Sequence, residues 1–347
     1  MKKNLLLLGL AVAAMTSCTN EEVLSELQES PKAISFDSFV NKATRAVTPT
    51  DANISKFYAY AYYGADQTVF NGEEVTKSDS KWDYTNTAYW TQNEYQFAAY
   101  ADGNNGAALA NVTFADGTLT IPSYTVSDDK DLVADVITKD NSNFGAAAQD
   151  VQFTFDHLLT KVKFNIINTS RDYKMKITAL TVTGAKATGK VDVTASEAVW
   201  TGAANANAVT YTPVAASTDA YIAKYDNNSE ACQVSSEEMF VMPQDLANVK
   251  FSITATFYDD NNQVVATKTF TNAAFAGKNR TDNDTKEDVD TWAPGTSYVY
   301  TLSLPVAARP IVFGEPGIAN WATGGIVELN PNGNDEGVQT PEPETED

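Results

Sequence analysis

The stretch Val151-Gln-Phe-Thr-Phe-Asp-His157-Leu-Leu-Thr-Lys-Val-Lys-Phe-Asn-Ile166 carries the clearest apolar alternation in the chain. An apolar residue at every second position is typical of a β-strand that buries one face. The alternating positions are first Val151, Phe153 and Phe155, and then, after Leu158 and Leu159, Val162, Phe164 and Ile166. This change of phase by one residue predicts a bulge or a corner between two sheets.

Similar strand patterns continue on both sides of that stretch. They occupy residues 57–63, 95–100, 111–121, 251–257, 264–270 and 298–304, separated by turn-forming clusters such as Asp116-Gly117 and residues 259–262. The chain also holds 16 Tyr and 16 Phe, and about 40 Thr, all of which favour pleated surfaces. These patterns predict an all-β fold built from sandwiches.

The charge balance excludes several classes of partner. The 347 residues include 24 Lys and Arg against 45 Asp and Glu, a formal net charge of −21. That balance argues against nucleic acid, because phosphate binding depends on Lys and Arg, and against polybasic attachment to anionic lipid. One His and two Cys leave little for catalysis or for a zinc site.

The N-terminus predicts an export signal with lipid attachment. Two lysines precede the apolar run 5–14, which is too short to span a bilayer as a helix. Small residues then lead to Cys18, as in a bacterial lipobox, where the cysteine is lipidated and becomes the mature N-terminus. Glu21 and Glu22 resemble the signal that sends Bacteroidetes lipoproteins to the outer face of the outer membrane. The alternative is an ordinary signal peptide with an incidental cysteine.

The composition along the chain predicts five parts. They are a signal peptide (1–17), a propeptide with a removable first strand (18–45), an N-terminal β-sandwich (46–148), a C-terminal β-sandwich (149–330) and an acidic disordered tail (331–347). In the propeptide strand, Ile34, Phe36 and Val40 share one face. The step Thr44-Arg45-Ala46 suits a trypsin-like protease, although it also fits an unremarkable basic linker.

No group of residues nominates a catalytic site or a cofactor. His157 is in phase with the buried face, and we expect a core histidine with a hydrogen-bonded partner. We expect Cys232 to be structural. The acidic run 282–290 departs from EF-hand spacing, which leaves a solvated loop or a weak cation site. The aromatic runs 58–63 and 82–90 suit a sandwich core better than a sugar-stacking platform.

Several short motifs follow one another in a distinctive order. After the lipobox they are Ile34-Ser-Phe36, Tyr89-Trp90, Tyr95-Gln-Phe-Ala-Ala-Tyr100, Asp131-Leu-Val-Ala134, Phe153-Thr-Phe-Asp-His157-Leu-Leu-Thr-Lys161-Val-Lys-Phe164, Phe240-Val-Met-Pro243-Gln244, Trp292-Ala-Pro-Gly295-Thr-Ser-Tyr298 and Ile318-Ala-Asn-Trp321. Each motif is weak alone. In this order they resemble the fimbrillin-type pilus subunits of Bacteroidales.

The resemblance implies two tandem transthyretin-like Greek-key β-sandwiches that assemble by strand exchange. In that scheme an Arg-specific surface protease cuts between Arg45 and Ala46, and the strand that carries Ile34, Phe36 and Val40 leaves. A donor strand from another fimbrial subunit then fills the gap. The expected donor region is residues 311–329, with apolar positions Ile311, Phe313, Ile318, Trp321 and Ile326.

The function expected from this resemblance is that of a structural subunit of a cell-surface fimbria, a homo- or hetero-polymer that supports adhesion. Before processing, its lipid would hold it in the outer membrane. The alternative is a lipid-anchored adhesin, or a tip or accessory subunit, that binds a glycan or host protein without polymerising. The acidic tail leaves the position in the fibre open.

Overall fold

In the computed structural model, the described residues are 32–40, 54–64, 67–79, 81–103, 105–127, 130–142, 150–202, 208–211, 221–226, 230–275, 278–280, 286–306, 312–313 and 317–320. Their regular secondary structure is almost entirely β-strand, so the expected all-β fold is confirmed. A short 3-10 turn, η3, covers Glu230–Cys232. Within these residues, helices long and apolar enough to cross a bilayer are absent.

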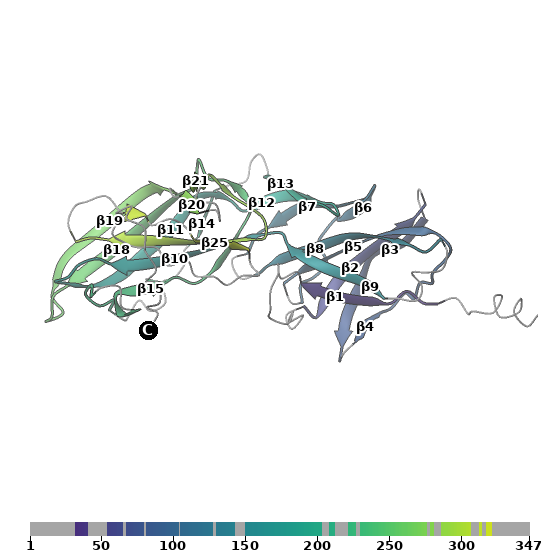
Figure 1. Cartoon of the computed structure of the whole chain (residues 1–347), viewed down its shortest axis with the longest axis horizontal. Helices are drawn as coiled ribbons and strands as arrows, with labels where there is room; N and C mark the ends of the chain where they lie inside the picture. Colours follow the sequence, from purple (N-terminus) through teal and green to yellow (C-terminus); the bar gives the residue numbers. More distant parts are fainter. Residues whose placement is uncertain are drawn as a thin grey trace, which may run out of the picture.

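The molecule is elongated, with the earlier strands at one end and the later strands at the other (Figure 1). The strands of the N-terminal end and its sheets are β1 (Phe36–Val40), β2 (Lys56–Tyr63), β3 (Gln67–Ser78), β4 (Lys81–Tyr84), β5 (Glu94–Asp102), β6 (Thr113–Ala115), β7 (Thr118–Thr125), β8 (Leu132–Asp140), β9 (Val151–His157), β12 (Thr188–Val193) and β13 (Ala198–Gly202).

The remaining strands form the other end and the small pairings beside it. They are β10 (Thr160–Asn168), β11 (Lys174–Lys186), β14 (Ala208–Tyr211), β15 (Gln233–Ser235), β16 (Met239–Val241), β17 (Gln244–Asp245), β18 (Lys250–Tyr258), β19 (Val264–Ala274), β20 (Lys278–Arg280), β21 (Lys286–Asp288), β22 (Thr291–Trp292), β23 (Thr296–Leu304), β24 (Val312–Phe313) and β25 (Gly317–Asn320).

The N-terminal end is organised around a seven-stranded sheet of order β1-β9-β8-β5-β2-β3-β4. Its central strands bury both faces, which explains their nearly continuous apolar sequences. One face of β2 contributes Phe57 to one core, whereas the other face contributes Tyr58 and Tyr60 to a second core. The second core is closed by the four-stranded sheet β13-β12-β7-β6.

Strands from beyond residue 148 take part in both N-terminal sheets. β9 lies between β1 and β8, and β12 pairs with β7, for example Val191 with Ile121. The chain therefore passes into the C-terminal end through β10 and returns to the N-terminal end through β12 and β13. The turn between β6 and β7 has positive φ at both Asp116 and Gly117, as a type I′ hairpin requires.

The C-terminal end is built from two further sheets around one apolar core. A sheet of order β15-β10-β23-β24 also carries β16 and β25, and a four-stranded sheet has the order β14-β11-β18-β19. Phe164 from β10 and Phe251 from β18 meet in this core, with ring centroids 6.1 Å apart. Fully buried Trp292 donates its indole N–H to the Tyr300 hydroxyl at 3.0 Å.

The phase change in the opening stretch is a corner between two sheets. β9 ends at His157 in the N-terminal sheet, and β10 begins at Thr160 in a C-terminal one. Leu158 and Leu159 between them are buried, and their carbonyl oxygens accept bonds from Trp200 Nε1 at 2.8 Å and Gly295 N at 2.9 Å. The corner thus joins the two ends of the molecule.

Candidate functional site: the first strand and its groove

The first described segment, residues 32–40, is an edge element whose partners lie far along the chain. β1 pairs with β9 in parallel, from Phe36 opposite Val151 to Val40 opposite Phe155. The Val151 amide donates to the Ser35 carbonyl at 2.6 Å. A parallel partner cannot come from a hairpin, so β1 is attached to β9 by pairing rather than by a short loop.

The same segment also bonds on its opposite side, to the chain that follows β4. Ile34 N donates to Ala88 O at 2.9 Å, and Trp90 N donates to Lys32 O at 3.0 Å. The Tyr84 hydroxyl donates to the Ile34 carbonyl at 2.5 Å. Residues 32–40 therefore lie in a groove with backbone partners on both walls.

The side chains of the segment complete the N-terminal core. Ile34 is 1% exposed and Phe36 is 5% exposed. The Phe36 ring lies in a pocket of four aromatic rings, with centroid distances of 5.4 Å to Phe70, 5.4 Å to Tyr84, 5.9 Å to Phe57 and 6.0 Å to Phe153. Burial of two such side chains stabilises by roughly 1.5–3 kcal/mol each. The segment is consequently part of the fold.

The polar side chains of the segment are also placed. Ser38 is buried, at 2% exposure, and its amide donates to the Asp37 carboxylate at 2.8 Å. The Ser35 hydroxyl bonds the Asp150 carboxylate just before β9. The groove therefore accepts apolar side chains at positions 34 and 36 and a small side chain at position 38.

The structure contains only some of the residues singled out from the sequence. Ile34, Phe36 and the backbone of Val40 lie in the groove segment. The backbones of Phe313 and Ile318 are described, in β24 and β25. The other residues lie outside the described part of the chain, namely Cys18, Arg45, Ala46, Ile311, Trp321 and Ile326.

The described part of the C-terminal region lies on its own half of the molecule. β24 pairs antiparallel with β23, with Phe313 opposite Leu302, and β25 pairs with the start of β23, with Asn320 opposite Thr296. β23 itself runs parallel to β10. In this state residues 312–313 and 317–320 extend the sheet of their own chain.

His157 has a partner that the sequence patterns did not identify. Its Nδ1 lies 2.5 Å from Asp131 Oδ2, and both side chains are about one-fifth exposed, at 21% and 19%. Burial raises the pKa of the Asp131 carboxyl, and the hydrogen bond from His157 opposes that effect. This pair ties the start of β8 to the end of β9, beside the corner. The expected hydrogen-bonded partner is present, but the His157 side chain is partly exposed at the end of β9 and is not the core residue that the alternation predicted.

The two tryptophans of the run 82–90 are core residues. Trp82 is 8% exposed and Trp90 is 5% exposed. Their rings pack against Phe57 at 4.8 Å and Tyr95 at 4.9 Å. Neither indole is available as a stacking platform, so the sandwich-core interpretation of this run holds.

The comparisons with known proteins agree with this architecture. The fimbrillin-like family model matches residues 44–321. The chain belongs to the fimbrillin-like family. A fimbrial protein from Bacteroides vulgatus shares the fold, at 18% identity and a TM-score of 0.58, over 84% of this chain and 99% of that one. A Parabacteroides distasonis protein assigned to cell adhesion aligns at 12% identity and a TM-score of 0.50, over 84% and 96%. No curated protein matches the chain.

Family membership gives the chain the role of a fimbrial or adhesion subunit at the cell surface, not that of an enzyme. Groups of three or more His, Cys, Asp or Glu that could hold a metal ion are absent from the described part of the chain. Residues 282–285 of the acidic run lie outside it, and Cys232 is fully buried.

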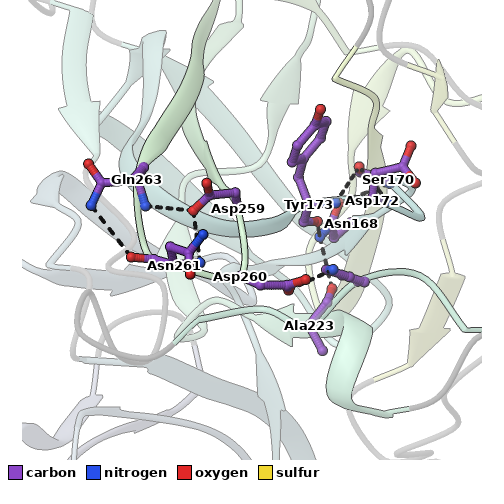
Figure 2. Close-up of polar contacts among 10 residues, drawn as sticks. Asn168, Ser170, Asp172, Tyr173, Ala223, Asp259, Asp260, Asn261 and Gln263 are labelled. Atoms are coloured by element: carbon purple, nitrogen blue, oxygen red, sulfur yellow. Dashed lines mark hydrogen bonds and ion pairs between the residues drawn. The ribbon is translucent and has the colours of Figure 1, made fainter.

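A second surface of this fimbrillin-like chain lies where β10, β11 and the β18–β19 turn meet. Figure 2 shows Asn168, which donates to the carbonyls of Tyr173 at 2.9 Å and Ala223 at 2.8 Å. The Asp259 carboxylate accepts bonds from the amides of Asn261 and Gln263. The loops that carry these residues are thus held by local hydrogen bonds.

Beside these loops, Tyr221 is exposed, at 38%. The ammonium groups of Lys174 and Lys176 both lie 4.4 Å from its ring centroid. This exposed aromatic ring was missed in the sequence, because Tyr221 belongs to no alternating run. Its contacts with the two lysines of β11 are tertiary contacts, which a local pattern in the sequence does not report.

Proposed function

We propose that the chain is a structural fimbrial subunit, exported as a lipoprotein on Cys18, cleaved after Arg45 and polymerised by donor-strand exchange. The observation that supports this most directly is the groove segment, residues 32–40. It is buried and paired on both walls, yet it is joined to the rest of the molecule by the chain that contains Arg45. Cleavage there would turn an integral strand into a separate, dissociable peptide.

Loss of the segment would leave an incomplete fold. The edge of β9 and the backbone of residues 88–90 would lose their partners, and the aromatic pocket around Phe36 would open to water. An open sheet edge is a template for pairing with another chain. A strand from another subunit that enters the groove restores both the backbone bonds and the apolar contacts, which is β-augmentation.

Each partner has its own place in this assembly. Lipid on Cys18 holds the precursor at the outer face of the outer membrane, and an Arg-specific surface protease releases residues up to Arg45. Residues 311–329 of another subunit supply the donor, with Ile311, Phe313, Ile318, Trp321 and Ile326 as its candidate apolar positions. The tandem transthyretin-like domains remain a prediction, whereas β9, β12 and β13, which follow the expected division at 148/149, pair in the N-terminal sheets.

The direct test is limited digestion of the purified full-length precursor with an Arg-specific protease. We expect a new N-terminus at Ala46, loss of residues 32–40, and growth from monomer to polymer in size-exclusion chromatography. Arg45→Ala should block all three changes, whereas Lys42→Ala, a matched loss of charge in the same linker, should not. Cleaved protein that stays monomeric and keeps residues 32–40 contradicts the proposal.

A second candidate function is a non-polymerising adhesin or tip subunit. The observation in its favour is exposed Tyr221 with its two lysines, an aromatic and cationic surface on an acidic protein. The N-terminal residue of the surface form separates the two functions, because Cys18 indicates a retained anchor and Ala46 indicates processing. A glycan array with Tyr221→Ala beside the wild type tests the adhesin: binding that needs Tyr221 supports it.

A further inference from the structure

An exposed cluster of side chains lies on the outer face of the sheet β14-β11-β18-β19, and one backbone pairing fixes its position. Met175 of β11 and Ile222 form an antiparallel bridge in which both N–H···O bonds are made, at 2.9 and 2.7 Å. Both side chains are buried in the C-terminal core. Successive side chains of a strand point to opposite faces, so the neighbours Lys174, Lys176 and Tyr221 point outward.

The same face continues across the next two strands. Tyr258 of β18 pairs with Lys174, and Val264 of β19 pairs with Tyr258, so all three share a face. Val264, its neighbour Val265 and Tyr221 are three of the five large apolar side chains that are exposed in the described part of the chain. Such side chains are ordinary when scattered singly, whereas a group of them marks an interaction site. The aromatic–lysine face, as we call it, consists of Lys174, Lys176, Tyr221, Tyr258 and Val264.

The aromatic–lysine face lies far from the groove of β1. β18 and β19 extend to one end of the molecule, and β1 lies at the other (Figure 1). Lys174 is the first residue of β11 and Tyr258 is the last residue of β18, which places the face at that outer end. A ligand bound here consequently leaves the groove and its strand untouched.

The aromatic–lysine face is cationic on a chain whose net charge is −21. The ammonium groups of Lys174 and Lys176 each lie 4.4 Å from the ring centroid of Tyr221, so they are no farther apart than twice that distance. Among the described residues, neither ammonium forms an ion pair with a carboxylate. One acid group of a ligand can therefore reach both.

The two acids of the adjoining β18–β19 turn are already engaged. Figure 2 shows the Asp259 carboxylate, which accepts the backbone amides of Asn261 and Gln263 at 2.9 and 2.8 Å. The Asp260 carboxylate pairs with the Lys224 ammonium at 2.6 Å. These acids are held by the turn and its neighbour and leave the two lysines of the face to an external anion.

The size of the face selects the kind of ligand. From the strand of Tyr221 to β19 there are three strand spacings of about 4.8 Å, or roughly 14 Å. Two residues on one face of a strand add roughly 7 Å in the other direction. The resulting area of roughly 100 Å² is far below the 800 Å² or so that each partner buries in a stable protein complex. It suits a short saccharide better than a folded partner.

The chemical groups of the face complete the assignment. The rings of Tyr221 and Tyr258 meet at 80°, with centroids 5.1 Å apart, and form an apolar corner for the C–H bonds of a sugar ring. A lysine ammonium is a point charge with three donors, which suits a carboxylate or a sulfate equally. We propose that the aromatic–lysine face binds an anionic saccharide, with the acid group between Lys174 and Lys176 and the sugar ring in the tyrosine corner. This inference rests on the adhesin candidate and names its ligand class.

Isothermal titration calorimetry of the purified full-length precursor tests the charge requirement. The probe is trigalacturonic acid, and its methyl ester is the uncharged counterpart, which needs no change to the protein. We expect the ester to bind at least about tenfold more weakly than the acid, because charge-assisted hydrogen bonds are lost. Lys174→Gln with Lys176→Gln should weaken binding of the acid by a similar factor. Lys81→Gln with Lys130→Gln removes two exposed lysines at the N-terminal end and should change it by less than about twofold.

Substitution of the exposed ring tests the sugar contact. Tyr221→Ala should weaken binding of the acid at least about fivefold, whereas Tyr221→Phe, which keeps the ring, should preserve it. Tyr89→Ala is the control, because Tyr89 is 52% exposed at the N-terminal end, and it should have no effect. Saturation-transfer NMR should show contact with the C–H protons of the sugar in the wild type and lose it in Tyr221→Ala.

A disaccharide with a sulfate and no carboxylate separates the two anions, and binding of either acid that depends on both lysines supports the inference. Equal binding of acid and ester, binding that survives loss of both lysines, or no binding of either acid overturns it. Tighter, lysine-dependent binding of a hexaglutamate peptide also overturns it, because the face then fits an acidic protein segment. A neutral glycan that binds through Tyr221 alone keeps the adhesin candidate and overturns this inference, whereas a glycan array without any bound glycan overturns both. Polymerisation after cleavage tests the structural fimbrial function separately.

Discussion

At the scale of single residues, Phe36 is the side chain that binds the first segment to the rest of the protein. Its ring touches aromatic rings from β2, β3, β4 and β9. These strands come from both ends of the seven-stranded sheet. One ring from the segment therefore connects the two walls of its groove.

We predict that Phe36→Ala lowers the free energy of unfolding of the uncleaved precursor by about 3–5 kcal/mol, because it leaves a cavity in an aromatic cluster. Urea denaturation measures this change. Tyr89→Ala is a matched control, since Tyr89 is 52% exposed on the neighbouring wall, and it should shift stability by less than about 0.5 kcal/mol. An equal effect of the two substitutions would contradict the proposed role of Phe36.

A second prediction at this scale concerns Asp131. Because burial raises the pKa of its carboxyl in the folded state, the folded protein binds this proton more tightly than the unfolded chain does. The stability that protonation of Asp131 contributes is fully present at a pH below the ordinary pKa of 3.8. It is lost as the pH rises through the raised pKa of the folded state. The measurement is the melting temperature as a function of pH, and Asp131→Asn should remove the fall in this range. Asp156→Asn is the control, because Asp156 lies on the exposed face of β9, and it should leave the profile unchanged.

The sequence predicted some residue roles better than others. The inward position of Phe36 and the partnered state of His157 follow from local alternation. The identity of the partner does not, because Asp131 lies 26 positions away and meets His157 only when β8 pairs with β9. Tyr221 was missed for the same reason, since its lysines belong to another strand.

At the scale of elements, β1 presents two distinct edges, and its odd and even residues differ in their roles. Odd-numbered residues face β9, whereas Ser38 faces the other way. The same substitution at neighbouring positions should consequently have different effects.

We predict that Phe39→Pro weakens the attachment of β1 by about 1–3 kcal/mol, because it removes a ladder donor and leaves a carbonyl of β9 without its partner. Ser38→Pro should cost less, because its amide does not belong to the ladder. The measurement is amide hydrogen exchange of β9 in the precursor: protection should fall with Phe39→Pro and persist with Ser38→Pro. Equal loss of protection in the two variants would contradict the assignment of the Phe39 amide, and not the Ser38 amide, to the ladder with β9.

The patterns located most strands but not their order in the sheets. Residues 151–157 and 160–168 were expected as strands with a corner between them, and the structure has β9 and β10 there in two sheets. Period-two alternation reports which face of a strand is buried and contains no information about its neighbours. The parallel pairing of β1 with β9, and the return of β12 and β13 to the N-terminal end, therefore required the structure.

At the scale of the whole molecule, the net negative charge of each subunit opposes the encounter of two subunits during assembly. Removal of residues 1–45 takes away five basic and five acidic residues, so the cleaved chain keeps the net charge of −21. Two such subunits repel each other before any strand can enter a groove. The repulsion is long-ranged at low salt, with a Debye length of about 30 Å at 0.01 M against about 8 Å at 0.15 M.

We predict that polymerisation of the cleaved protein is several-fold faster at 0.15 M than at 0.01 M salt, because screening favours encounter. Once formed, the polymer should dissociate at nearly the same rate in both, because backbone bonds and buried apolar contacts hold the strand. Light scattering after a salt jump measures the first rate, and dilution measures the second. Polymer that falls apart at high salt would point to ionic rather than strand-mediated cohesion.

The pairing of β1 with β9 also has a consequence for the order of folding. The Ser35–Asp150 contact joins residues 115 positions apart, and closing so long a loop is slow compared with forming the hairpins inside it. The first segment should accordingly dock after β2, β5 and β8 have assembled, which pulsed hydrogen exchange would detect as late protection of residues 36–40. A nascent chain then has an open groove from the time the rest of that end has folded until the first segment docks, and closure of that groove marks a subunit as complete.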